Sequence, residues 1–322
     1  MIHEEITKGL NHLIETDRIF HAVIFSGSEG IGKKTLARSF AMAIHCESEH
    51  NRPCGVCPSC IKHKTGNHPD FLEVHPEKDK KIMGVNVIRE AFEDLYIKPL
   101  LSDKKIIFIP EADMLEAPGQ NAMLKSFEEP PPYGVIILAV KKLSSLLSTI
   151  KSRAVIYELN PAPTSKIEEI LKEKYPEKER EIPFYASFSG GLIGKAINFC
   201  ESEDFSSLRN EEIGLLTEFP KSRYGALRLA DFFKEREDKD SYTFDIALSF
   251  FRDLAVQKEG SSDFINSDIK EKIVSLGTNI SKKGAAKALF LLSEAKTKKS
   301  KNAIYDLWIT NLFIEMWEVL NG

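Results

Sequence analysis

The chain has 322 residues, of which 42% are hydrophobic and 29% are charged, and its formal net charge is −4. This length allows two or three domains with cores of their own, and the acidic balance excludes the strong overall basic charge of an autonomous DNA-binding protein. No apolar stretch approaches the roughly 18 residues that span a bilayer, and residues 1–5 do not have the basic start of a secretion signal, so we expect a cytoplasmic location.

The first strongly apolar segment, residues 22–25, predicts a buried strand, and a phosphate-binding loop follows it. The sequence GSEGIGK at residues 27–33, called the phosphate loop below, fits the Walker A pattern G-x-x-x-x-G-K. An ordinary strand-to-helix turn is the alternative, but the preceding strand and a matching second motif favour a phosphate site. The residues expected to bind phosphate are Gly27, Gly30, Gly32 and Lys33.

The residue after the Walker A lysine argues against hydrolysis. A working site has Ser or Thr there as a ligand of Mg²⁺, whereas this chain has Lys34, and Thr35 comes one position too late. Because Mg²⁺ needs oxygen ligands at about 2.0–2.1 Å, a lysine ammonium in that place repels the ion. The sequence therefore predicts that the Mg²⁺ site is lost and leaves binding of ATP without hydrolysis open.

A cluster of cysteines follows the predicted helix at residues 34–44. Spacing of two residues lets neighbouring thiolates reach one tetrahedral ion, which predicts a structural Zn²⁺ site with no open position. Disulfides are disfavoured in a reducing cytoplasm, and redox catalysis by C-x-x-C does not need four cysteines. Nearby histidines leave open whether one of them replaces a sulfur. The predicted ligands are Cys46, Cys54, Cys57 and Cys60, and the histidines are His45, His50, His63 and His68.

The second half of the nucleotide site is also altered. Residues 106–109 form an apolar run followed by acids, the shape of a Walker B strand, but the position of the metal-binding carboxylate holds Pro110. Proline offers neither a carboxylate nor an N–H donor. Glu111 is retained, yet a base without a bound metal has little to act on. Replacement of the missing acid by Asp113 stays an alternative.

Strand-like and helix-like segments alternate up to residue 158, which predicts an α/β domain with a mostly parallel, helix-covered sheet. The segment Asn-Pro-Ala-Pro at 160–163 breaks this pattern and is typical of a domain joint. From there to residue 322 only helical periodicity is found. The last predicted helix carries one apolar stripe, which is typical of core packing or, alternatively, of an oligomer interface. Its members are Ile309, Leu312, Phe313, Met316 and Leu320.

Taken together and in this order, the motifs resemble those of the AAA+ clamp-loader subunits of bacterial DNA polymerase III, in particular the delta-prime family. Besides the Walker segments and the cysteines, three strings carry the resemblance: RIFHA, NAMLKSFEEPP and Ser-Arg, at residues 18–22, 121–131 and 152–153. Each string alone is weak, but the combination is specific and extends over essentially the full length.

The resemblance implies three domains. These are a RecA-like AAA+ α/β domain at 1–159 with a zinc module at about 46–60, a small helical lid domain at 160–205, and an all-α collar domain for oligomerisation at 206–322. The implied partners are the gamma/tau motor subunits and the delta subunit, joined in an open ring. With bound ATP such a ring opens the sliding clamp and sets it on primed DNA.

Within this family, three positions distinguish the chain from the ATP-hydrolysing gamma/tau motors. Lys34 and Pro110 replace the two metal ligands, and Gly194 stands where motor lids carry a phosphate-binding arginine, with Lys195 one position late. Each change removes a charged or metal-binding group that phosphoryl transfer uses. We therefore expect a non-hydrolysing stator subunit. An active motor ATPase is the main alternative, and an unrelated P-loop kinase is a remote one.

The resemblance also implies an arginine finger. In the family, a Ser-Arg-Cys motif projects its arginine into the ATP site of the neighbouring motor, and in GTPases such a finger contributes on the order of 10³–10⁵ in rate. Ser152 and Arg153 match the motif, while Ala154 replaces its cysteine. Because the electrostatics do not need the cysteine, Arg153 is expected to act in trans. An ordinary surface charge is the alternative.

Overall fold

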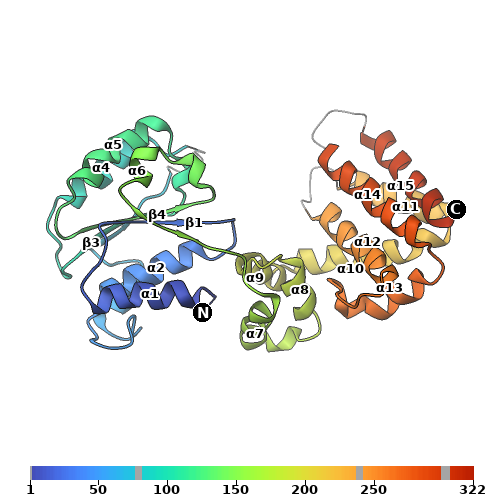
Figure 1. Ribbon diagram of the computed structural model, residues 1–322, viewed down its shortest axis with the longest axis horizontal. Helices are drawn as coiled ribbons and strands as arrows, with labels where there is room; N and C mark the ends of the chain where they lie inside the picture. Colours follow the sequence, from blue (N-terminus) through green and yellow to red (C-terminus); the bar gives the residue numbers. More distant parts are fainter. Residues whose placement is uncertain (1, 77–81, 237–241, 299–304) are drawn as a thin grey trace. The chain divides into compact units, whose positions relative to one another are not determined.

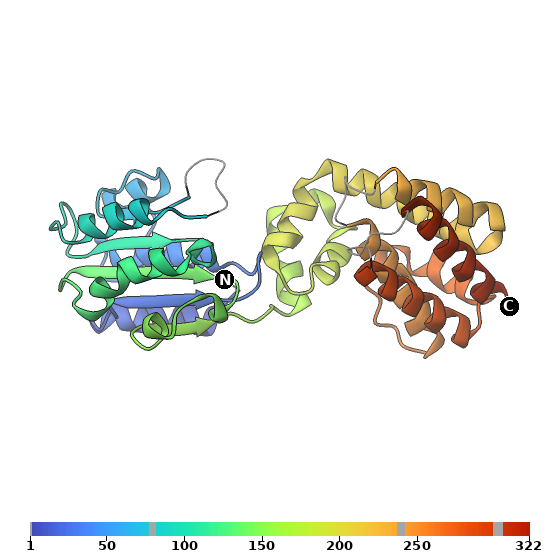
Figure 2. The same cartoon turned by 90° about the horizontal axis from the view of Figure 1, so that it is seen from above.

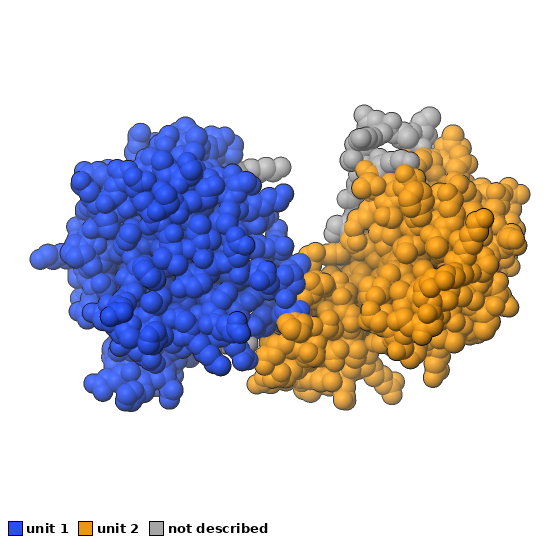
Figure 3. Space-filling model, viewed as in Figure 1, with its two compact units in different colours: residues 1–162, 192–194 blue, residues 163–191, 195–322 orange. Residues whose placement is uncertain are grey.

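The computed structural model describes residues 2–76, 82–236, 242–298 and 305–322. The chain forms two compact units (Figure 3): Met1–Ala162 with Leu192–Gly194, and Pro163–Gly191 with Lys195–Gly322. The boundary lies inside the Asn-Pro-Ala-Pro segment, and the division of the second unit into lid and collar domains stays a prediction. Among the described helices, none combines the length and apolar character needed to cross a membrane.

The first unit is built on a five-stranded sheet in which every pairing is parallel and the strand order is β2-β3-β4-β1-β5. Every residue of β1, β3 and β4 is buried. Parallel strands covered on both faces require apolar side chains at successive positions, which explains the uninterrupted apolar runs in the sequence. The strands are β1 (Ala22–Ser26), β2 (Phe71–Glu73), β3 (Lys105–Ile109), β4 (Gly134–Val140) and β5 (Val155–Glu158).

Helices cover both faces of this sheet (Figure 1). Val23 and Phe25 of β1 pack in the core formed with α1 (Glu4–Glu15) and α2 (Lys33–Ile44). Ile24, between them in the sequence, belongs to the opposite core. That core includes residues of α4 (Val85–Leu95), α5 (Ala117–Glu128) and α6 (Ser148–Lys151). The alternation follows from the two-residue period of a strand.

The carboxyl ends of β1, β3 and β4 meet at one edge of the sheet. From there β1 continues through the phosphate loop into α2, whereas β3 leads to the 3₁₀ turn η1 (Ala112–Met114) and β4 to the 3₁₀ turn η2 (Leu143–Ser145). Open parallel sheets bind ligands outside the carboxyl ends of their strands. The predicted nucleotide-site residues are therefore gathered at this edge. The cysteine cluster lies between α2 and β2, around the short helix α3 (Pro58–Lys64).

In the second unit, the regular secondary structure of the described residues is all helical, with loops between the helices (Figure 2). The predicted fold, a parallel α/β domain followed by a helical region, is thus confirmed. The apolar stripe of the last helix is buried within the bundle, in agreement with core packing. The helices are α7 (Thr164–Lys174), α8 (Ile182–Phe188), α9 (Ile193–Glu201), α10 (Glu203–Glu218), α11 (Arg223–Lys234), α12 (Thr243–Lys258), α13 (Lys270–Gly277), α14 (Lys282–Lys298) and α15 (Tyr305–Asn321), with 3₁₀ turns η3 (Pro176–Lys178), η4 (Phe219–Lys221) and η5 (Ser267–Ile269).

Arg209 of α10 joins early and late parts of this unit. Its guanidinium carbon lies 3.4 Å from the ring centroid of Phe184 on α8. Nη1 and Nη2 each donate to an oxygen of Asp268 on η5 at 2.8 Å. A paired, bidentate geometry of this kind compensates the cost of burying the arginine, whose exposed fraction is 5%.

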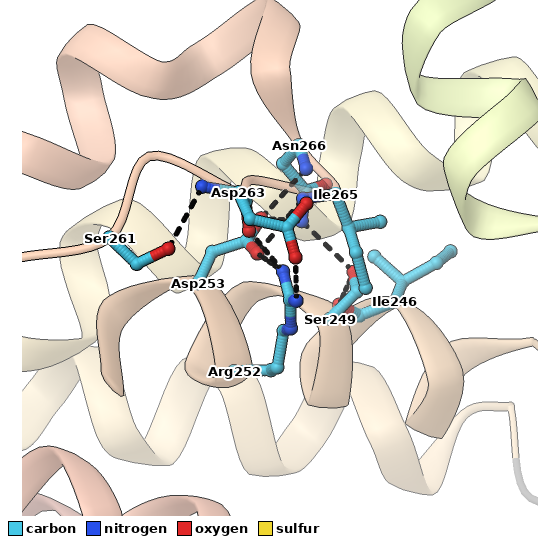
Figure 4. A network of polar contacts seen from close by, with 8 residues as sticks. All are labelled: Ile246, Ser249, Arg252, Asp253, Ser261, Asp263, Ile265 and Asn266. Atoms are coloured by element: carbon cyan, nitrogen blue, oxygen red, sulfur yellow. Dashed lines mark hydrogen bonds and ion pairs between the residues drawn. The ribbon is translucent and has the colours of Figure 1, made fainter. Parts of the chain in front are cut away.

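A buried carboxylate fixes the loop after α12 (Figure 4). Asp253 is fully buried and accepts hydrogen bonds from the backbone N–H groups of Ile265 and Asn266 at 3.0 and 2.7 Å. The amide of Asn266 and Nη1 of Arg252 also donate to it, at 3.0 and 2.9 Å. Arg252 extends further to the carboxylate of Asp263 at 2.7 Å. The charge of Asp253 is therefore compensated inside the unit.

Candidate functional site

The phosphate loop connects β1 to α2 in a tight left-handed path. Gly32 is the N-cap of α2 with φ 104°, a conformation that only glycine adopts readily. At Gly27 a Cβ atom would lie 2.8 Å from the carbonyl oxygen of Leu159, so no side chain fits there. The glycines of the motif are thus required by the shape of the loop itself.

Lys33 folds back onto the loop that precedes it. Its Nζ donates to the carbonyl oxygens of Gly27 at 2.6 Å and Ser28 at 2.8 Å. The residue is only 8% exposed, and this burial lowers the pKa of its ammonium group. The lysine that would hold phosphate oxygens is therefore satisfied by carbonyl groups of its own chain.

The two positions at which the sequence predicts the loss of a metal ligand lie at the same edge of the sheet. Lys34 Nζ and Glu111 Oε1 form an ion pair at 2.6 Å. Pro110 follows directly after β3, at the place where the sequence lacks a carboxylate. The acid of the second motif is thus paired with the residue that follows the Walker A lysine.

A third lysine, which the sequence did not single out, forms an ion pair with the phosphate loop. Lys141 follows the last residue of β4, and its Nζ lies 2.6 Å from Oε2 of Glu29 in the phosphate loop. This pairing raises the pKa of Lys141 and lowers that of Glu29. The sequence signal that could have identified Lys141 as a site residue is its position directly after a central parallel strand.

Asp113 is hydrogen-bonded to the turn that follows β4. Its carboxylate accepts from the backbone N–H of Lys141 at 2.9 and 2.6 Å and of Lys142 at 3.3 Å. The hydroxyl of Ser145 donates to it at 3.1 Å. These bonds join η1 to the turn after β4, which gives Asp113 a structural role.

Residues Leu192–Gly194, which belong to the first unit, lie against the phosphate loop. The backbone N–H of Gly194 donates to the carbonyl of Gly30 at 2.7 Å. A Cβ atom at position 194 would lie 3.0 Å from Cα and from the carbonyl oxygen of Gly30. The position at which the resemblance expects an arginine in motor subunits is therefore too close to the loop for any side chain without a shift.

Arg153 lies apart from these residues, just before β5. Its Nη1 donates to the carbonyl of Thr149 at 3.0 Å and to Oγ of Ser152 at 3.3 Å. Nη2 forms an ion pair with Oε1 of Glu128 at 3.0 Å. Within the described ranges, no hydrogen bond or ion pair joins Arg153 to Lys33, and 37% of its side chain is exposed. Its contacts all lie on α5, α6 and the turn that follows α6.

The four predicted cysteines lie together. Their sulfur atoms lie within 4.8 Å of one another, and Sγ of Cys54 and Cys60 are 4.0 Å apart. Backbone N–H groups donate to the sulfurs of Cys46, Cys54 and Cys57 at 3.4 Å each. Backbone hydrogen bonds lower the pKa of Cys54 to about 6, while burial raises that of Cys60 to about 12. Four such sulfurs fit a tetrahedral Zn²⁺, whose charge would compensate the buried thiolates.

Three of the four nearby histidines form a separate group beside this cluster. His45 Nδ1 lies 2.9 Å from His63 Nε2, and His45 Nε2 lies 2.9 Å from the carbonyl of Lys104. The ring of His68 stacks on both, with centroids 4.4 and 4.5 Å away. Burial lowers the pKa of His45 to about 3 and that of His63 to about 4. The rings are therefore neutral at pH 7, and their nitrogen atoms, within 4.8 Å of one another, form a second set of possible metal ligands that is separate from the four cysteines.

Comparisons with known proteins identify the family of the chain. The sequence model of the family described as "DNA polymerase III, delta subunit" matches residues 2–163, half of the chain. DNA polymerase III subunit delta' of Bacillus subtilis is 26% identical over 94% of this chain and 92% of its own length. Subunit gamma of Buchnera aphidicola is 30% identical over 73% of this chain and 66% of its own length.

Among solved structures, a gamma subunit-related protein of Thermotoga maritima covers 97% of this chain and 98% of its own, with 18% identity and a TM-score of 0.46. The family assignment depends on the sequence matches. The chain belongs to the DNA polymerase III delta' subunit family of clamp-loader proteins.

Proposed function

We propose that this chain is the non-hydrolysing stator subunit of the replicative clamp loader. In this role it helps to assemble the loader that places the sliding clamp on primed DNA, together with the gamma/tau motor subunits and the delta subunit. It supplies Arg153 to the ATP site of a neighbouring motor and has no ATPase activity of its own. The observation that carries the proposal is the ion pair between Lys34 and Glu111.

This ion pair affects both the metal ion and the water-orienting acid that hydrolysis requires. An ammonium group at the ligand position next to the Walker A lysine opposes a divalent cation, and Pro110 provides no carboxylate to attract one. Phosphoryl transfer needs the metal to neutralise charge that develops on the phosphate oxygens. Glu111, which would orient water, has its charge compensated by the same lysine. The hydrogen bonds that Lys33 and Gly194 donate to carbonyl groups of the phosphate loop also support a site without hydrolysis.

The arginine finger is the active contribution that we assign to the chain. Arg153 is a partly exposed guanidinium with contacts only to its own helix end and to Glu128 among the described residues. Its distance in the chain from Lys33 and the lack of any contact between the two are consistent with service to a neighbour's site. A planar guanidinium binds phosphate oxygens with two N–H groups, which suits a transferred phosphoryl group.

The same proposal includes a structural Zn²⁺ held by the cysteine cluster. Cys46 comes from the end of α2, and the remaining three cysteines flank or begin α3. A zinc ion with these four ligands would join the segment around α3 to the end of α2, and it would leave no coordination position open. The ion thus supports the fold and takes no part in chemistry.

An active motor ATPase is the second candidate, favoured by the 30% identity to a gamma subunit. The purified chain alone separates the two candidates. A stator hydrolyses no ATP above background in the presence of Mg²⁺, whereas a motor does so and loses the activity in Lys33→Ala.

The finger itself is tested in a loader assembled from this chain with gamma/tau and delta subunits. We expect Arg153→Ala to leave assembly intact and to lower DNA-stimulated ATPase and clamp loading by at least about 10²-fold per affected site. Lys151→Ala, a cation two residues away in the sequence, is the matched control and should retain the parent rate. An undiminished rate in Arg153→Ala refutes the assignment.

A further inference from the structure

Resting on the proposed function, we infer that Glu128 is a positioning residue that holds the arginine finger against its own subunit until a neighbour's triphosphate competes for it. The juxtaposition is direct, since Glu128 Oε1 lies 3.0 Å from Nη2 of Arg153. Two further bonds fold the same guanidinium onto Thr149 and Ser152. In this arrangement the finger points at its own chain.

The location of Glu128 is unfavourable for the helix that carries it. It is the last residue of α5, where the helix dipole is negative and a carboxylate is disfavoured. Pro130 and Pro131 follow closely, so the end of α5 is sharply defined and the carboxylate is held at a fixed place. The acid does not stabilise its helix end, and Arg153 is the cation that compensates it.

The strength of the pair suits a contact that must open. Half of the Glu128 side chain and 37% of the Arg153 side chain are exposed, so solvent screens the pair. A triphosphate carries more negative charge than one carboxylate and accepts both N–H groups of a guanidinium edge. It therefore competes successfully when it comes within reach, while in its absence the finger returns to Glu128.

The experiment uses the assembled loader with this chain as the parent, Glu128→Gln, or Glu129→Gln. Glutamine keeps the shape of residue 128 and removes its charge. We expect Glu128→Gln to raise kcat/KM for ATP by about two- to fivefold, the range that corresponds to opening an exposed ion pair. Glu129→Gln is the matched control, because it removes the adjacent acid, for which the structure shows no ion pair with Arg153.

A second background makes the result specific. In Arg153→Ala the Glu128→Gln change should have no further effect, since the two residues act as one unit. The inference is overturned if Glu128→Gln behaves like Glu129→Gln, or if it lowers kcat as Arg153→Ala does. Failure of the proposed function is distinguishable, because in that case Arg153→Ala alone leaves the ATPase rate unchanged.

Discussion

Lys34 and Glu111 stand 77 positions apart in the chain and meet with Nζ and Oε1 separated by 2.6 Å. The pair joins the start of α2 to the turn after β3, at the edge where a nucleotide-binding sheet would hold its metal. Each partner thereby compensates the other's charge at the positions where an active site of this kind holds its metal. This ion pair gives the two altered motifs a common physical consequence, and under the proposed function it keeps a divalent cation out of the site.

Restoring both metal ligands should reopen the site to the metal. We expect Lys34→Thr combined with Pro110→Asp to bind Mg²⁺-nucleotide about tenfold or more tightly than the parent, because hydroxyl and carboxylate oxygens return together. Equilibrium titration of a fluorescent nucleotide with and without Mg²⁺ measures this. Each single change should gain little. Equally tight Mg²⁺-dependent binding by the parent chain would contradict the closed site.

Two glycines in helices should respond oppositely to alanine. At Gly194 the new Cβ meets the backbone of Gly30 at 3.0 Å, whereas at Gly214 of α10 nothing lies within 4 Å. We expect Gly194→Ala to lower the free energy of unfolding of the first unit by about 1–3 kcal/mol through overpacking. Gly214→Ala should stabilise the second unit by about 0.5–1 kcal/mol, since alanine favours a helix.

Chemical denaturation monitored by hydrogen exchange assigns these changes in the free energy of unfolding to the first or the second unit. In Gly194→Ala, exchange of the amide at position 194 should also become faster, because the added Cβ strains the hydrogen bond to Gly30. A destabilisation of equal size in both variants would show that the contact with the phosphate loop has no special role.

Replacement of two cysteines of the cluster should remove its zinc and loosen only the segment around α3. Chain purified without chelator should contain about one zinc per molecule, and joint replacement of Cys57 and Cys60 by serine should abolish it, because two of four ligands are lost. Cys200→Ala is the control: this buried cysteine lies in α9, outside the cluster, and its replacement should leave the zinc content unchanged. Elemental analysis and protease cleavage around α3 measure both effects. A folded, protected cluster free of metal would be incompatible with the zinc proposal.

The buried carboxylate of Asp253 should contribute far more to stability than the exposed carboxylate of Asp263. Asp253→Ala leaves the N–H groups of Ile265 and Asn266 without their acceptor, so we expect a loss of about 3–5 kcal/mol in the free energy of unfolding. Asp263→Ala, at a side chain that is 82% exposed, should cost at most about 1 kcal/mol. Denaturant titration compares the two, and similar losses would mean that the network in Figure 4 is not a stabilising unit.

Several features could be predicted from the chain alone. The runs at β1, β3 and β4 are apolar at nearly every position, which only a sheet covered on both faces requires. The absence of the two metal ligands at Lys34 and Pro110 is a matter of residue type, and the cysteine spacing limits which chemistry the cluster can support. Such inferences depend on neighbours in sequence, so no long-range contact is needed to make them.

The partners of the charged groups were decided by the tertiary structure. Sequence spacing did not indicate that Lys33 turns back to its own loop, that Lys141 reaches Glu29, or that Glu128 holds Arg153. Whether an ion pair forms depends on side-chain directions at the ends of separate strands and helices, which are fixed only when the sheet and its two helix layers pack. The sequence by itself determined which chemical groups stand at the motif positions, and the folded arrangement decided which of their charges compensate one another.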